Sequence, residues 1–280
     1  RPCGGVPARS QKGRGPFNRE MSSPVVRGGA SQCDIASALP MLYRAKRAVI
    51  IGDPKQLSHI STLSKKQDLS LLQKYEVNMG WSYSANSLYA MASGLTSPDQ
   101  IVQLRDHHRS FGDIIEFSNA EFYDGRLRVA TNYDRLRCPR NVEAGIRWVN
   151  VVGKTTRPPA GGAYNDAEAA AIVKEIRRLV TDNGYTGTVG VVTPFRAQAE
   201  RIRAAIERSL ELVSALAKND FLVDTVHKFQ GDERDLMFFS PVISHGTPQG
   251  ALGFLKNTGN LFNVAITRAR AVLVVVGDFS

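Results

Sequence analysis

Two short segments in which every residue is apolar, each ending in Gly-Asp, constrain the fold of this chain most. Residues 271–276 (Ala-Val-Leu-Val-Val-Val) precede Gly277-Asp278, and residues 48–51 (Ala-Val-Ile-Ile) precede Gly52-Asp53. A strand that is apolar on both sides needs cover on both faces, as in a parallel sheet with helices above and below it. The two segments therefore predict an α/β fold.

Strand-like and helix-like patterns alternate along the chain. Further strands are predicted at residues 101–104, 146–152, 188–193, 221–226 and 236–240, and helices at 84–93, 111–122, 195–209 and 261–269. Asn165 and Gly184 are the expected cap and end of another helix. Repeated units of this length predict a doubly wound, mostly parallel sheet. In such sheets ligands bind beyond the carboxyl ends of the strands.

Composition narrows the class of protein. Apolar residues make up 42% of the 280 positions, enough for a core, but no apolar run approaches the ~20 residues of a membrane span. We therefore expect no membrane partner. Three cysteines are too few and too scattered for a disulfide scaffold or a zinc site, so we also expect a reducing, intracellular setting and no metal. The net charge of +10 is a weak indication of a phosphate-bearing partner.

Residues 1–29 differ from the rest of the chain. They hold six glycines, four prolines and six of the basic residues, against one acidic residue. The composition predicts a disordered basic leader without regular structure. The remaining chain divides at residues 94–98 (Gly-Leu-Thr-Ser-Pro), which predicts one segment at 30–98 and a second at 99–280.

Five predicted loops carry polar clusters: residues 52–57, 104–110, 193–198, 224–233 and 263–270. A simple turn explains Gly52-Asp53 equally well, and an N-cap explains Thr193. Arg109 precedes a predicted helix, where an anion binds favourably. His107 and His108 are a poor metal site because adjacent residues do not share a helix face. For the same reason Arg268 and Arg270, placed on one helix, are not expected to serve the same site.

The order of these clusters resembles the later motifs of superfamily-one helicases of the Upf-like group. The resemblance rests on six segments in sequence: Ala30-Ser31-Gln32, residues 52–57, Arg109-Ser110, Thr193-Pro194-Phe195, residues 226–233 and residues 264–270. It covers residues 30–280. It implies that 30–98 is the remnant of a first RecA-like lobe and 99–280 the second lobe of an ATP-dependent DNA or RNA helicase, which couples hydrolysis to movement along a strand.

The resemblance also implies roles for individual residues. Gln56 matches the sensor of the ATP γ-phosphate, and Arg109 and Arg268 match the two arginines that reach it. The candidate ATP-binding residues are Asp53, Gln56, Arg109, Gly231, Glu233 and Arg268. The candidate residues for single-stranded DNA or RNA are Thr193, Pro194, Thr225 and His227. Guanidinium groups suit the first role because they are permanent, planar cations, so lysine is expected to fail at either position.

The sequence departs from the family in two places. The complete phosphate-cradling loop, Gly-x-x-x-x-Gly-Lys-Ser/Thr, has no match, and the family's Asp-Glu pair, which holds Mg²⁺ and activates water, reads Gly28-Gly29. We therefore expect a truncated or mis-framed product that lacks the Mg²⁺ ligands and does not hydrolyse ATP alone. We also expect residues 30–98 to leave apolar surface open. The alternatives are a catalytically dead fragment that binds nucleic acid or docks a partner, such as the missing first lobe, and an unrelated α/β nucleotide enzyme.

Overall fold

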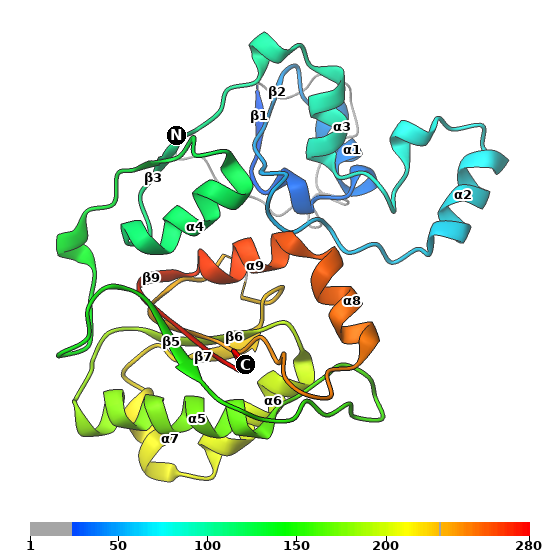
Figure 1. The fold of residues 1–280 in the computed structure, drawn as a ribbon. Coiled ribbons are helices and arrows are strands. Elements are labelled where there is room, and N and C mark those ends of the chain that lie inside the picture. The colour runs from blue at the N-terminus through cyan, green and yellow to red at the C-terminus, as the bar shows by residue number, and fades with distance from the viewer. Residues whose placement is uncertain (1–23, 230) are drawn as a thin grey trace. The chain divides into compact units, whose positions relative to one another are not determined.

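The computed structural model describes residues 24–229 and 231–280. The chain divides into two compact units, residues 1–103 and 104–280, which are described separately (Figure 1). The mixed α/β architecture confirms the predicted fold class.

A five-stranded sheet forms the centre of the second unit. Its strands are β5 (Gly145–Asn150), β6 (Val189–Thr193), β7 (Leu222–Thr225), β8 (Arg234–Phe239) and β9 (Ala269–Gly277). Every neighbouring pair is parallel, and the order across the sheet is β5-β9-β8-β6-β7. The last strand thus inserts between β5 and β8, and residues 271–276 are buried as their apolar sequence predicts.

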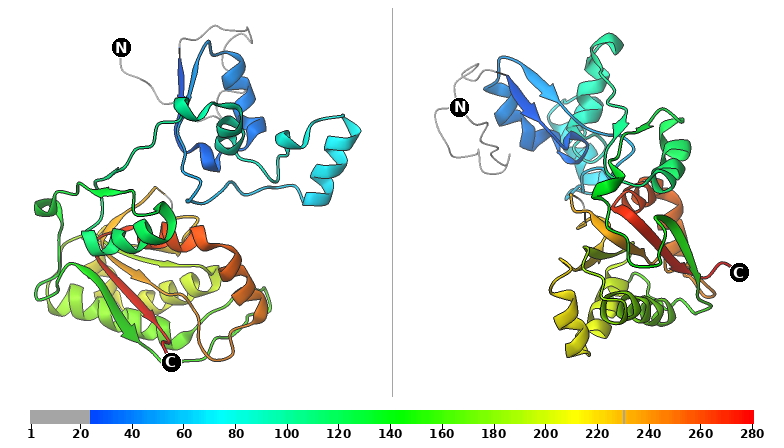
Figure 2. Two further views of the ribbon diagram at one scale, coloured as in Figure 1. Left: turned by 45° about the horizontal axis from the view of Figure 1, so that its top comes forward. Right: turned by 90° about the vertical axis from the view of Figure 1, so that its left-hand side faces the viewer.

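Helices cover both faces of this sheet. In Figures 1 and 2, α5 (Asp166–Arg177), α6 (Arg196–Glu207) and α7 (Leu210–Leu216) lie on one face, and α4 (Gly112–Tyr123) and α9 (Gly259–Ile266) on the other. One more helix of the unit, α8 (Gln249–Asn257), directly precedes α9 in the chain. The main core lies under α5 and α6, where Ile172, Ile176 and Ile202 are fully buried against the sheet.

Local sequence explains the ends of α5. The Asn165 side chain accepts hydrogen bonds from the backbone N–H groups of Ala167 and Glu168, so the predicted cap is confirmed. The helix continues into a wider turn at Arg178–Asp182, and the chain leaves it through Gly184 at φ 65°. That left-handed conformation favours glycine, which confirms the predicted end.

A short parallel pair, β3 (Asp106–His107) with β4 (Arg128–Val129), precedes the main sheet in the second unit. The backbone N–H of Phe111 donates to the carbonyl of Arg270 on β9 at 2.7 Å. This bond fixes the start of α4 against the sheet and brings residues 107–110 to its edge.

The first unit is small. Strands β1 (Val25–Arg27) and β2 (Ala48–Ile50) form a parallel pair, accompanied by helices α1 (Ile35–Tyr43), α2 (Lys65–Lys74) and α3 (Leu88–Leu95). Its core holds Ala30, Cys33, Ala38 and Leu88. Ile60, Tyr75 and Leu95 remain 72%, 63% and 77% exposed. This confirms the expectation that residues 30–98 leave apolar surface open.

Two predictions about regular structure are wrong. Residues 1–29 were expected to be a disordered leader, but Val25–Arg27 form β1. The prediction rested on the glycine and proline content of the whole segment and overlooked two adjacent β-branched residues, Val25 and Val26. Residues 1–23 lie outside the described residues. Residues 101–104 form no strand in the described structure. They are apolar, but Val102 and Leu104 are 82% and 83% exposed, and the strand begins only at Asp106.

None of the helices in the described part of the chain is long and apolar enough to cross a membrane.

Candidate functional site

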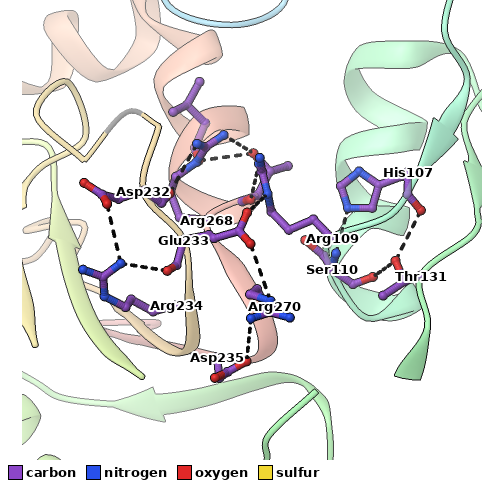
Figure 3. Close-up of polar contacts among 12 residues, drawn as sticks. His107, Arg109, Ser110, Thr131, Asp232, Glu233, Arg234, Asp235, Arg268 and Arg270 are labelled. Carbon is purple, nitrogen blue, oxygen red and sulfur yellow. Dashed lines mark hydrogen bonds and ion pairs between the residues drawn. The ribbon is translucent and has the colours of Figure 1, made fainter. Parts of the chain in front are cut away.

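A group of arginines surrounds Glu233 in the second unit (Figure 3). Glu233 immediately precedes β8, and Arg268 immediately precedes β9. These two strands pair in parallel with Arg234 opposite Ala269, and the backbone N–H of Arg234 donates to the carbonyl of Arg268 at 3.0 Å. Sheet register therefore places Glu233 and Arg268 side by side, although they are 35 positions apart in the sequence.

The Glu233 carboxylate contacts two further arginines. Nε of Arg109 donates to Oε2 of Glu233, and Nη1 of Arg109 donates to the carbonyl of Thr267 at 3.3 Å. Nε of Arg270 lies 3.6 Å from Oε1 of Glu233, and its Nη1 lies 3.4 Å from Oδ1 of Asp235. One half-exposed carboxylate thus orients two guanidinium groups that come from different elements.

Arg268 is the buried member of this arginine cluster (Arg109, Arg268 and Arg270). Its side chain is held by Nε to the Val264 carbonyl at 3.0 Å and Nη1 to the Asp232 carbonyl at 3.4 Å. Burial first, and then repulsion from Arg109, lowers the pKa of Arg268 to about 10. The group therefore stays cationic at neutral pH. Both guanidinium groups bond Thr267, Arg109 at its carbonyl and Arg268 Nη2 at its hydroxyl at 3.4 Å, so the two cations are close.

His107 supports the segment that carries Arg109. Burial first, and then the positive charge of Arg109, lowers the pKa of His107 to about 4, so the ring is neutral at pH 7. Its Nε2 accepts a hydrogen bond from the backbone N–H of Ser110 at 2.9 Å, while Thr131 Oγ1 donates to the Ser110 carbonyl at 2.8 Å. Both contacts fix the turn that ends at α4. Among the described residues, no group of three or more His, Cys, Asp or Glu side chains could hold a metal ion.

Two expectations about this region are corrected. The helix predicted at 261–269 ends at Ile266, so Arg268 follows a helix and Arg270 lies on β9; both belong to the same cluster, contrary to the helix-face argument. The cluster also lies at the amino ends of β8 and β9, not beyond carboxyl ends. The spacing rule failed because it assumed that one helix carried both arginines.

In the first unit, the Asp53 and Gln56 candidates lie in the turn after β2. The Asp53 carboxylate accepts from Gln56 Nε2 and from the Lys55 N–H, both at 2.9 Å. Its backbone N–H donates to Ser31 Oγ at 2.7 Å. Two of the motifs in the resemblance, residues 30–32 and 52–57, therefore contact one another through Ser31.

The candidate nucleic-acid residues lie at the carboxyl ends of β6 and β7. The arginine cluster lies at the other end of the parallel strands, where β8 and β9 begin. Thr193 is fully buried, and its hydroxyl accepts from the Phe195 N–H at 3.5 Å. The cap of α6 is Phe195, so the suggested N-cap at Thr193 is wrong. Thr225 ends β7 beside it, and the N–H of Val226 donates to the Thr193 carbonyl at 3.1 Å.

The loop from β7 to β8 carries the other candidates. Burial lowers the pKa of His227, which is half-buried. Phe229 is fully buried against Gly190, where a Cβ atom would come within 2.7 Å of its ring. Gly231 has φ 94°, a left-handed conformation that favours glycine. The loop thus runs from the carboxyl end of β7 back to Glu233 at the amino end of β8.

Sequence reasoning did not consider the tripeptide Gly153-Lys154-Thr155, which ends like a phosphate-binding loop. Trp148 occupies the position of that motif's first glycine, and the next helix starts only at Asp166. Thr155 is buried and donates to the Val242 carbonyl at 3.2 Å. A phosphate-binding loop needs a helix N-terminus directly after it, so this tripeptide is not such a loop. Instead, Lys154 forms a parallel bridge with His245.

The parallel sheet and its two helical layers define a doubly wound α/β domain. A family model described as an AAA domain matches residues 84–280, and the chain therefore belongs to this family, whose domain is typical of Upf-like superfamily-one helicases.

Curated relatives are named helicases. The chain is 28% identical to Helicase sen1 of Schizosaccharomyces pombe (92% of this chain, 14% of the relative), 31% to Putative helicase MOV-10 of Gallus gallus (82% and 26%) and 26% to Probable helicase senataxin of Homo sapiens (94% and 10%). It thus spans between 10% and 26% of these proteins. A solved structure of the PRRSV helicase matches 90% of this chain and 34% of its own at 16% identity and a TM-score of 0.41.

Proposed function

We propose that this chain is part of the core of an ATP-dependent DNA or RNA helicase, with residues 99–280 as the arginine-bearing second lobe and residues 30–98 as part of the first. The observation that carries the proposal is the gathering of Arg109, Arg268 and Arg270 around one carboxylate, Glu233. Cations held this close repel one another, so the arrangement is best explained by a polyanion that they bind.

In this function Arg109 and Arg268 stabilise the charge that develops on the γ-phosphate. An arginine finger accelerates such transfers by roughly 10³–10⁵. Arg268 suits the role because backbone carbonyls hold its buried side chain in place. Arg109 is more exposed, and its partner Glu233 is itself 40% exposed, so a phosphate can compete for it. Gln56 is the proposed γ-phosphate sensor, and Glu233 and Gly231 the contacts on the ribose side.

The fit to ATP with Mg²⁺, the family's cofactor, is partial. The arginines suit a triphosphate. The positions of the Mg²⁺-binding and water-activating carboxylates read Gly28 and Gly29, which have no side chain, so we assign no step through Mg²⁺ to these residues. We expect the 280 residues by themselves to show no ATP turnover stimulated by nucleic acid. Turnover that Arg268→Ala abolished would contradict this.

The proposed partner is a single strand of DNA or RNA, bound along the carboxyl edge formed by the ends of β6 and β7. Pro194, Thr225 and His227 lie there. Because Thr193 is buried, its proposed contribution is to shape this edge through its hydroxyl and carbonyl. The arginine cluster and the strand edge are connected by residues 226–233, which offer a direct route for coupling between the two ligands.

The test compares ATP and strand binding by the purified chain. Metal-free ATP in tenfold excess over its Kd should stabilise the second unit by about 1.4 kcal/mol, which corresponds to roughly 3–5 °C in Tm. Arg109→Ala, Arg268→Ala and Arg268→Lys should lose this shift, whereas Arg140→Ala, at an exposed arginine outside the cluster, should keep it. Labelled single strands should bind more weakly as salt rises. Strand binding without any ATP effect would favour the fragment that only binds nucleic acid, and loss of both would refute the proposal.

A further inference from the structure

A hollow of about 420 Å³ opens at the carboxyl edge of the main sheet. Its walls come from three segments that are distant in the sequence: the loop that precedes α5, the start of α6 and the start of α8. Arg157, Pro194, Phe195, Arg196, Pro248 and Phe254 line it. Sites for small ligands typically measure about 300–1,000 Å³, so this hollow has room for one nucleotide unit.

The floor of this hollow is apolar and aromatic. Phe195 is nearly buried, whereas Phe254 is 37% exposed. Their ring centroids are 5.9 Å apart at an interplanar angle of 50°, so Phe195 backs Phe254 from inside. An exposed ring with a packed partner behind it is a firm surface on which a flat base can stack, and every base offers such a face.

The rim is basic. Arg157 and Arg196 are both exposed, and Arg157 has no ion pair in the described part of the chain. Nε of Arg196 donates to Glu200 Oε1 at 2.8 Å, one turn along α6. This pair is exposed to solvent, so exchange of Glu200 for a phosphate costs little. Aromatic floor and basic rim together match a base with its phosphates better than they match an apolar protein segment.

A buried polar network holds two of these walls together, the loop before α5 and the start of α6, and joins them to the end of β8. The start of α8 packs on them through the apolar cluster of Ala163, Phe195, Val242, Ala251 and Leu255. The N–H of Asn165 donates to Gln198 Oε1 at 2.8 Å, and Gln198 Nε2 donates to Ser240 Oγ at 2.9 Å. Ser240 Oγ donates in turn to Glu168 Oε2 at 2.6 Å. All four side chains are fully buried, so separating the walls would leave polar groups without partners. The hollow is therefore set in advance by the fold.

We propose that this hollow receives one nucleotide of the bound single strand, with its base against Phe254 and its phosphates on Arg157 and Arg196. The inference rests on the proposed function and deepens it, because it names the residues that contact a base. Pro194 connects the hollow to the carboxyl end of β6, since this residue directly follows the strand and lines the hollow.

The experiment uses the full chain and fluorescent oligo-dT and oligo-U of about 12 nucleotides. Phe254→Ala should weaken binding about 5- to 150-fold, the usual range for loss of one stacking contact. Phe254→Tyr should keep it. Arg157→Ala should reduce the slope of log K against log salt by about 1. The matched control is Phe279→Ala, which removes an aromatic ring of 46% exposure that packs on Trp148 away from the hollow.

A set of oligonucleotides, each lacking one base at a different position, tests the base contact itself. At one position the missing base should weaken binding to the wild type but not to Phe254→Ala. Strand binding that is insensitive to Phe254→Ala, Arg157→Ala and every abasic position would overturn this inference while leaving the proposed function intact. Absence of strand binding by the wild type would overturn this inference, and together with absence of the ATP effect it would overturn the proposed function as well.

Discussion

Replacement of Glu168 by Gln should change how the stability of the second unit depends on pH. Glu168 is fully buried, and its carboxylate accepts hydrogen bonds from Ser240 Oγ at 2.6 Å, the Val242 N–H at 3.1 Å and Asn165 Nδ2 at 3.2 Å. Burial nevertheless dominates and raises the pKa of Glu168 from 4.5 to about 7. The folded state therefore holds a proton that the unfolded chain releases between these values.

The sign follows from that difference in bound protons. Between pH 4.5 and 7 the folded state binds more protons at Glu168, so its contribution to the free energy of unfolding falls as pH rises, and it is constant above pH 7. A pKa difference of this size corresponds to about 3 kcal/mol, of which roughly 2–3 kcal/mol falls between pH 5 and 8. The Glu168→Gln variant has no titrating group at this position, so its free energy of unfolding should not show this decrease between pH 5 and 8.

Gln also introduces a disadvantage. Its single amide oxygen can replace only one of the two carboxylate oxygens. At the Oε2 position it leaves N–H₂ facing the Asn165 Nδ2 donor, and at the Oε1 position it leaves N–H₂ facing the Val242 N–H. Either way an unsatisfied buried pair costs about 1–3 kcal/mol. At pH 5 the variant should therefore be less stable than the wild type by about that amount. By pH 8 the difference should vanish or reverse, because only the wild type then buries a charge.

Urea unfolding at several pH values measures both effects. Trp148 reports on the second unit when Trp81 of the first unit is replaced by Phe in both proteins. The comparison cancels other titrating groups, including His107, whose lowered pKa makes stability fall as pH drops from 6.5 towards 4. Parallel curves of unfolding free energy against pH for wild type and Glu168→Gln would refute the reasoning.

Three further outcomes are expected. Phe238→Ala, at a fully buried ring of β8, should destabilise the second unit by about 3–5 kcal/mol in the same urea assay; a loss below about 1 kcal/mol would show that the core is not packed as described. His107→Gln should remove the acid-dependent loss of stability between pH 6.5 and 4 and would contradict the lowered pKa if the wild-type slope persisted. Asp68→Ala should raise amide exchange at residues 82–84 of the first unit, since the carboxylate accepts from the Ser84 N–H at 3.0 Å and from its hydroxyl at 2.7 Å, while exchange at Phe238 stays unchanged.

The fold class follows from the sequence because its signals are local. Residues 271–276 are apolar at every position, and a segment of that kind is stable only when both faces are covered. Asn165 and Gly184 likewise mark the ends of a helix through their own backbone and side-chain chemistry. By contrast, the strand at residues 101–104 was predicted wrongly, because an apolar pattern does not show whether a neighbouring strand is there to pair with.

Much of the candidate site could also be named from the sequence, since motif order identifies Arg109, Glu233 and Arg268 without any knowledge of distances. Their arrangement depends on tertiary structure. Insertion of β9 between β5 and β8 sets the register that brings Arg268 beside Glu233, and the change from helix to strand at Ala269 turns Arg270 onto the same carboxylate.

The network of Asn165, Glu168, Gln198 and Ser240 depends on the fold in the same way. Its hydrogen bonds join residues as far as 72 positions apart, and the residues next to each member in the sequence do not indicate which residue it will bond. The sequence by itself therefore determined which elements form and which side chains carry charge. Only strand order, register and burial decided which of those charges meet, because such contacts depend on chain segments that are remote from one another.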